Sequence, residues 1–150
     1  MSINTTDKLI LNRIQSDFPI TNRPYQALAN ELGIDETTII ESVKKLKKTG
    51  IIRRIGGNFS PEKLGFQSTL CAANVPEDKL DYFCEVVNSY DGVTHNYQRD
   101  HYFNVWFTFI APSMDDIKFH LEQIKQKTGL QRILNLPATQ VFKIKAQFSV

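Results

Sequence analysis

Residues 27–46, ALANELGIDETTIIESVKKL, contain the spacing that decides the fold of the first part of this chain. Ala29, Gly33 and Ile39 follow one another at helix-turn-helix intervals: alanine lets two helices approach closely, glycine forms the turn, and isoleucine fills their junction. Asp35 is placed to cap the second helix, and Gly33 to close the first. The stretch therefore predicts a helix-turn-helix unit.

One helix before this unit and one hairpin after it complete the predicted first domain. Thr6 is placed to cap a helix that ends before Pro19 and has one apolar face made of Leu9, Ile10 and Ile14. Pro24 suits the first position of the helix that Gly33 closes. Residues 51–59, with Gly56-Gly57 as a turn, predict a short wing.

The rest of the chain predicts the element order β-α-β-β-α-β. Strands are expected at residues 66–75, 93–99, 103–110 and near 141–148, with helices starting at Pro76 and after Ser113. Two split βαβ units in this order predict a ferredoxin-like sheet with both helices on one face. The other face then needs a cover, most simply a second copy of the chain or a paralogue.

The predicted elements indicate an α+β protein, and the composition divides it into two domains, residues 1–60 and residues 61–150. The first has nine basic and six acidic side chains, a net charge of +3, and the second has nine and ten, a net of −1. Fourteen of the sixteen aromatic residues lie beyond position 50. A basic, aromatic-poor module therefore precedes an aromatic-rich one, with a boundary expected near Ser60-Pro61.

Several classes of protein are disfavoured by the same composition. No apolar run approaches the roughly 18 residues of a membrane span, and the start MSINTTDKLI lacks the basic and apolar regions of a signal peptide. The two cysteines, Cys71 and Cys84, show no metal-ligand spacing such as C-x-x-C, and no metal site is expected. We expect a reduced, cytoplasmic protein with no membrane partner.

The predicted central hairpin contains the side chains best suited to bind a ligand or take part in a reaction. Alternation along a strand places His95, Tyr97 and Arg99 on one face. If residues 101 and 102 form a two-residue loop, the same face receives their cross-strand partners Thr108, Trp106 and Asn104. His101 then lies at the rim of this surface, and the opposite face receives the apolar residues Val105, Phe107 and Phe109.

Two interpretations of that surface stay open at this point. Aromatic planes favour a flat ligand, arginine clamps carboxylates, and histidine ligates iron or moves a proton near neutral pH. A flat, polycarboxylated macrocycle containing a metal fits all three. The alternative is cross-strand pairing at a wet dimer interface, with stacked Trp106 and Tyr97 and a rim of histidine and arginine.

DNA binding is expected to be weak or absent. A helix at residues 35–48 would enter the major groove, and Lys44, Lys45, Lys47 and Lys48 lie near its end. Specific readers typically present Arg, Asn or Gln to base edges. This helix instead begins with Asp35 and Glu36 and continues with Glu41, which would repel phosphate.

The whole chain resembles the Lrp/AsnC family, in which a helix-turn-helix precedes a βαββαβ domain. Residues 95–109, HNYQRDHYFNVWFTF, look more specifically like the siroheme decarboxylase branch of that family, whose pattern H-N-Y-x-R-x-H-x-x-N-x-W-F they match without a gap. Residues 53–57, RRIGG, and residues 64–66, LGF, add to the resemblance.

The resemblance implies a siroheme decarboxylase subunit. Members remove the acetate carboxyl groups at C12 and C18 of sirohaem to give 12,18-didecarboxysiroheme, a precursor of haem. They work as pairs of paralogous subunits, so a heterodimer is implied and a homodimer is the alternative, with no cofactor beyond the iron of the substrate. His95 and His101 match the catalytic histidines, Arg99 matches a carboxylate-binding arginine, and substrate-binding roles follow for Tyr97, Asn104 and Trp106. The other candidate is a transcriptional regulator whose second domain senses a ligand.

Overall fold

The structure, a computed structural model, describes residues 3–57, 59–143 and 147–150. The chain divides into two compact units, one made of residues 1–57 and 143–150 and the other of residues 58–142. Residues 143–150 thus group with the first unit, although they fall within the predicted second domain, residues 61–150. Each unit is described by itself below.

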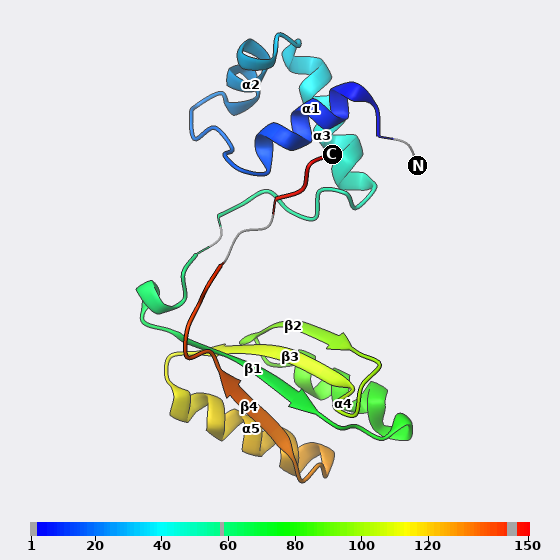
Figure 1. Cartoon of the computed structure of the whole chain (residues 1–150), viewed down its shortest axis with the longest axis vertical. Coiled ribbons are helices and arrows are strands. Elements are labelled where there is room, and N and C mark those ends of the chain that lie inside the picture. Colours follow the sequence, from blue (N-terminus) through cyan, green and yellow to red (C-terminus); the bar gives the residue numbers. More distant parts are fainter. Residues whose placement is uncertain (1–2, 58, 144–146) are drawn as a thin grey trace. The chain divides into compact units, whose positions relative to one another are not determined.

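Three helices form the first unit: α1 (Thr5–Ile14), α2 (Pro24–Leu32) and α3 (Glu36–Lys48) (Figure 1). Gly33 closes α2 in the left-handed conformation at φ 65°, which glycine adopts without steric cost. The Asp35 carboxylate accepts a 3.0 Å hydrogen bond from the Thr38 N–H at the start of α3. The helix-turn-helix prediction is confirmed, and its core consists of Ile10, Leu28, Ala29, Ile39, Val43, Leu46 and Ile52.

Two local predictions for this unit are wrong. Asn4, not Thr6, caps α1: its side chain accepts from the Asp7 N–H at 2.7 Å, and the Asp7 carboxylate accepts from the Asn4 N–H at 3.2 Å. Residues 51–57 and 59–60 are bends and loop rather than a wing. Asn58 of the expected wing lies outside the described residues.

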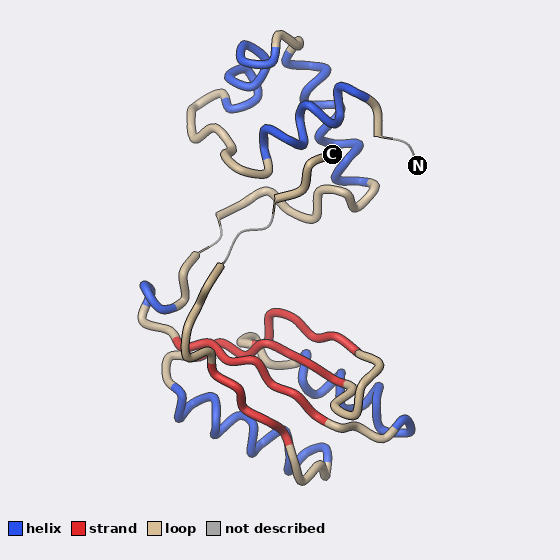
Figure 2. Tube along the Cα trace, viewed as in Figure 1, coloured by secondary structure: helices blue, strands red, loops and turns tan. Residues whose placement is uncertain are grey.

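The second unit has a four-stranded antiparallel sheet in the order β2-β3-β1-β4 with two helices on one face (Figures 1 and 2). Its elements in chain order are η1 (Glu62–Leu64), β1 (Gln67–Ala73), η2 (Glu77–Lys79), α4 (Leu80–Asn88), β2 (Val93–Gln98), β3 (Val105–Ala111), α5 (Met114–Thr128) and β4 (Ile133–Pro137). This is the predicted ferredoxin-like βαββαβ order.

The last strand lies earlier in the sequence than predicted. β4 pairs with β1 from Ile133 opposite Ala73 to Pro137 opposite Thr69. Residues 141–143 and 147–148 of the expected strand form loop, and residues 144–146 lie outside the described part of the chain. Because α5 ends at Thr128, a four-residue connection, residues 129–132, already brings Ile133 to the free edge of β1.

The sheet has one covered face and one open face. Side chains of β1 and β3 meet α4 and α5 in a core that includes Cys71, Phe83, Val87, Val105, Phe107, Phe109, Ile117, Leu121 and Ile124. No element of this unit is recorded against the opposite face within the described ranges. No helix in the described part of the chain has the length and apolarity that a membrane crossing requires.

Candidate functional site

The hairpin of β2 and β3 has the predicted register. His95 lies opposite Thr108 and Tyr97 opposite Trp106. The Arg99 N–H donates to the Asn104 carbonyl at 2.8 Å, which extends the same alignment by one step. Directly opposite residues project to the same face of a sheet, so these side chains share the open face.

A β-bulge sets which side chains of β2 reach that face. Val93 pairs with Phe109, but His95 pairs with Thr108, so the register shifts at Thr94. A bulge adds one residue and reverses the alternation beyond it. Val93 therefore packs against the helical core while His95 and Tyr97 point to the open face. Simple alternation does not predict this difference between Val93 and His95.

Two cross-strand rows form the surface of the open face. One row runs from Tyr97 through Trp106 and Ala72 to Leu134, and the next contains His95, Thr108, Leu70 and Leu136. Leu70 and Leu136 remain 42% and 43% exposed. The result is an apolar platform across the sheet with phenol, indole and imidazole groups at its β2 side, a surface suited to a flat ligand.

The His95 ring stacks on Tyr97, with ring centroids 6.1 Å apart and planes inclined by 28°. Its Nδ1 atom lies 3.0 Å from the Thr94 hydroxyl oxygen. A hydroxyl both donates and accepts, so this contact permits a proton on Nδ1 and leaves Nε2 free. His95 is therefore able to present a nitrogen lone pair or, when protonated, two donors.

His101 is held differently, in the loop between β2 and β3. Its Nδ1 atom accepts a hydrogen bond from the Phe103 N–H at 3.1 Å, and its ring centroid lies 6.5 Å from that of Trp106. A ring nitrogen that accepts carries no proton, so the neutral imidazole keeps its proton on Nε2. His101 thus presents an N–H donor rather than a lone pair.

Trp106 and Asn104 use their polar groups within the protein. The Trp106 indole N–H donates to the Phe103 carbonyl at 2.6 Å, which leaves the ring face as its surface for a ligand. The Asn104 carboxamide pairs with the backbone of Val75, accepting from its N–H and donating to its carbonyl, both at 2.8 Å. The substrate-binding role predicted for Asn104 therefore competes with a structural one.

Arg99 is exposed, and its guanidinium forms no hydrogen bond or ion pair within the described residues. The structure thus places Tyr97, Trp106 and His95 in adjacent positions of one face, with Arg99 directly after β2. His101 lies in the loop that follows and contacts this group through Trp106.

Two residues at the loop were not singled out from the sequence. The Asn74 side chain donates to the Tyr102 carbonyl, and the Arg132 guanidinium lies 5.7 Å from the centre of the Phe103 ring. Both are distant from the loop in sequence, so no local pattern would have found them. They add contacts that hold the loop next to the end of β1 and the start of β4.

Other reactive groups of this unit are poorly placed for chemistry. Burial raises the pKa of the Cys71 thiol to about 12, and burial also raises the pKa of Cys84. Both thiols are therefore weak nucleophiles near neutral pH. Within the described ranges no three His, Cys, Asp or Glu side chains lie close enough together to hold a metal ion.

Comparison with known families assigns both units. A family model described as the AsnC-like ligand binding domain matches residues 63–143, and a model described as the siroheme decarboxylase NirDL-like HTH domain matches residues 7–53. Escherichia coli AsnC has the same fold, with a TM-score of 0.80 at 23% identity over 97% of this chain and 98% of that chain. The protein thus has the architecture of the Lrp/AsnC class.

Closer relatives narrow the class. The siroheme decarboxylase alpha subunit of Oleidesulfovibrio alaskensis is 52% identical over 96% of this chain and 87% of its own length. The siroheme decarboxylase NirD subunit of Stutzerimonas stutzeri is 34% identical over 99% and 96%. The chain belongs to the siroheme decarboxylase branch of the AsnC-like family.

A solved structure of that branch was determined with a tetrapyrrole. Siroheme decarboxylase NirDL in complex with an iron-uroporphyrin III analogue is 32% identical to this chain, with a TM-score of 0.69 over 97% of it. This chain spans only about half, 48%, of that NirDL chain. A NirDL polypeptide is therefore about twice as long as this one.

Proposed function

We propose that this chain is a siroheme decarboxylase subunit that removes the C12 and C18 acetate carboxyl groups of sirohaem to give 12,18-didecarboxysiroheme. The observation that carries the proposal is the open sheet face, where Tyr97, Trp106 and His95 adjoin an apolar platform. A macrocycle bearing carboxylates matches a flat surface with aromatic groups and an exposed arginine. Relatives at about 50% identity with this name support it.

Binding on this surface rests on the platform and on Arg99. The faces of Tyr97 and Trp106 would stack on the flat ring, since the indole N–H is already used by Phe103. Arg99 would bind a peripheral carboxylate through two parallel N–H donors, which fixes the rotation of the ring. This fixed orientation places one acetate group near the histidines.

Decarboxylation then breaks the bond between the acetate methylene carbon and its carboxyl carbon. The electron pair of that bond stays on the methylene carbon and spreads into the macrocycle, and CO₂ leaves. A proton must then reach the methylene carbon, and a positioned histidine accelerates such a transfer by about 10²–10⁴-fold. The acid afterwards regains its proton from water.

The two histidines differ in what they offer to this reaction. His101 presents Nε2–H, because Phe103 occupies its Nδ1 atom, and we assign it to a hydrogen bond with the substrate. His95 keeps Nε2 free and supports it with Thr94 at Nδ1. We therefore assign to His95 the proton delivery or, as the alternative, the contact with the iron of the substrate.

The proposal includes a partner and a compartment. A paralogous subunit would complete the site by covering the open face, since separate NirD and NirG subunits exist and NirDL has about twice this length. A second copy of this chain is the alternative cover. No cofactor beyond the iron of the substrate is proposed, and two unpaired cysteines suit a reducing, cytoplasmic compartment.

The test is anaerobic incubation of the purified chain with sirohaem, alone and with its paralogue, followed by mass analysis. Loss of two CO₂ from the tetrapyrrole is the expected result with the correct partner. If sirohaem is recovered unchanged under all combinations while it binds, the site is a sensor. The second candidate, a transcriptional regulator of the Lrp/AsnC type, then takes precedence, since the fold and the helix-turn-helix fit it equally.

A further inference from the structure

The loop from Arg99 to Asn104 contains His101 and is attached to a distant part of the chain. Asn104 lies just before β3, and its half-buried carboxamide meets the backbone of Val75, which follows β1. We infer that Asn104 is a positioning residue for His101. This inference rests on the proposed function, because it assigns to Asn104 an effect on the reaction through His101 rather than contact with substrate.

The contact between Asn104 and Val75 has the form of a peptide pair. One oxygen accepts and one nitrogen donates, each at 2.8 Å, so the carboxamide replaces a residue of a neighbouring strand. Val75 is buried, with 2% of its surface exposed. Loss of the carboxamide would leave both backbone groups of Val75 without a protein partner in a poorly solvated position. The pair therefore fixes the distance between the loop and the end of β1.

Further bonds make the loop rigid from end to end. The Arg99 N–H donates to the Asn104 carbonyl at 2.8 Å, and the His101 N–H donates to the Arg99 carbonyl at 3.0 Å. The Phe103 carbonyl accepts from Trp106, and the Tyr102 carbonyl accepts from Asn74. A loop with so many of its backbone groups paired keeps one conformation. The pair between the Asn104 carboxamide and the Val75 backbone attaches the end of this loop to the rest of the unit.

This conformation determines how His101 faces the ligand. The Phe103 N–H reaches Nδ1 at 3.1 Å only while residues 101–103 keep their turn. If Asn104 releases the loop, the imidazole loses that donor and exchanges its proton between Nδ1 and Nε2. A shift of about 1 Å in a catalytic group costs up to 10²-fold in rate, even when it originates away from the chemistry.

The first test is the tautomer of His101 in the full chain, measured by ¹⁵N NMR of the imidazole at about pH 8, where a free imidazole is neutral. The chain has three histidines, so a His101→Ala spectrum assigns the signal. We expect a pure Nε2–H signature in the wild type and a mixture of tautomers in Asn104→Ala. An unchanged His101 signature in folded Asn104→Ala would overturn the inference.

Asn135→Ala is the matched control. Asn135 is also half-buried and hydrogen-bonded, to Thr69 at 2.5 Å, but it lies on the helical side of β4. Its loss should lower stability without changing the His101 signal. If Asn104→Ala does not fold, Asn74→Ala loosens the same loop from an exposed position and should shift the signal in the same direction. A wild-type signal in that variant would contradict the inference.

The second test is a kinetic cycle in the active complex. Asn104→Ala should lower kcat by about 10–10²-fold with KM nearly unchanged. In a His101→Ala background the same substitution should have little further effect, because a positioning residue acts through the group that it positions. Additive losses of kcat would show a role independent of His101. If the wild-type complex has no decarboxylase activity, the proposed function fails, whereas the NMR result still decides the positioning.

Discussion

Both compact units contain ion pairs, among them Lys118 with Asp115 in the second, but the units differ in how their arginines are used. In the first unit, charges pair with one another: Arg13 with Glu31 at 2.5 Å, and Arg23 with Glu36 at 2.7 Å. In the second unit, Arg99 forms no ion pair within the described residues, although it is exposed beside aromatic groups. Paired charges support a fold, whereas an unpaired arginine on a flat surface is available to a ligand.

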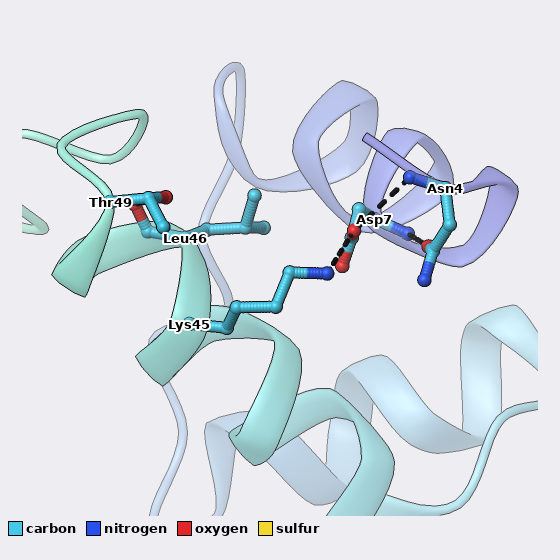
Figure 3. A network of polar contacts seen from close by, with 5 residues as sticks. All are labelled: Asn4, Asp7, Lys45, Leu46 and Thr49. Atoms are coloured by element: carbon cyan, nitrogen blue, oxygen red, sulfur yellow. Dashed lines mark hydrogen bonds and ion pairs between the residues drawn. The ribbon is translucent and has the colours of Figure 1, made fainter. Parts of the chain in front are cut away.

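The strongest example of a structural charge is the Asp7 carboxylate at the start of α1. It is fully buried and lies 2.5 Å from the Lys45 ammonium on α3, next to its own cap contact with Asn4 (Figure 3). Burial by itself would raise the pKa of Asp7, but Lys45 and the Asn4 N–H together hold that pKa below its usual value. One of the four lysines of α3 is thus used for the fold.

The largest expected effect tests the second unit alone. His95→Ala and His101→Ala should bind sirohaem but lower turnover by about 10²-fold or more, as expected for loss of a catalytic acid or donor. A change in the visible spectrum of bound sirohaem in one variant only would identify the iron contact. Turnover assays with the partner subunit and spectra of the bound complex measure both.

His120→Gln is the control for those variants. The His120 ring stacks on Phe109 at 5.6 Å on the helical side of the sheet, away from the open face. Its replacement should change stability but leave turnover unchanged. If both His95→Ala and His101→Ala retain wild-type turnover with the correct partner, the catalytic groups lie in the partner and this chain contributes architecture.

Arg99 should give the next largest effect, on binding. Arg99→Ala should weaken sirohaem binding by about 1.5–3 kcal/mol, the contribution of a hydrogen bond to a charged group. Lys118→Ala, which removes an exposed positive charge from the helical side of the sheet, should have no such effect. Spectroscopic titrations decide between them, and overlapping curves for Arg99→Ala and wild type would contradict the carboxylate clamp.

A smaller effect is expected in the first unit, on stability rather than on activity. Lys45→Met leaves the buried Asp7 carboxylate without its cation, which should cost about 1–2 kcal/mol of unfolding free energy, because Lys45 is half exposed and solvent screens the pair. Lys44→Met, an exposed neighbour, should change stability by less than about 0.5 kcal/mol. Equal denaturation midpoints for the two variants would show that the buried ion pair makes no net contribution to the free energy of unfolding.

The same carboxylate predicts a pH dependence. Because the pKa of Asp7 is lowered in the folded state, its contribution to stability is complete above the unfolded value of about 3.9 and is lost as pH falls through the lower folded value. The melting temperature should therefore fall more steeply below about pH 4 in the wild type than in Asp7→Asn. Parallel slopes in both proteins would assign the acid sensitivity to other carboxylates.

The helix-turn-helix and the hairpin register were predictable because their signals are local. Gly33, Asp35 and the alternation around Trp106 lie within a few residues of the features that they specify. The prediction of a last strand near residues 141–148 was wrong, because the segment that pairs with β1 is decided by which one can reach it. The short connection after α5 brings residues 133–137 to β1 first.

Long-range contacts explain why two polar pairs of the structure were not predicted. The buried pair of Asp7 and Lys45 joins positions 38 residues apart, and the pair of Asn104 and Val75 joins positions 29 apart. In a single sequence, no local pattern around Asp7 or Asn104 indicates these distant partners. The sequence therefore predicts which side chains lie on the open face. It does not predict polar partners that are distant in the chain, such as Val75 for Asn104, because the fold brings them together.

The smallest expected effect is on DNA affinity. The first unit should bind DNA no more tightly than a protein without sequence specificity. Lys45 of α3 is paired with Asp7, so one of its four lysines is not free for phosphate. The repulsion expected from Glu36 is reduced by its ion pair with Arg23 at 2.7 Å, whereas Asp35 and Glu41 stay unfavourable for phosphate. Binding to duplex DNA should be no tighter than the roughly 10⁻⁴–10⁻⁶ M of non-specific association and should fall steeply with added salt. Fluorescence anisotropy at two salt concentrations, with random and promoter-derived duplexes, measures this directly, and Lys44→Ala should lower the salt slope by at most about one contact. Nanomolar, sequence-selective binding at physiological salt would instead make the first unit a functional reader, and the comparison between a structural unit and a ligand-binding unit would no longer hold.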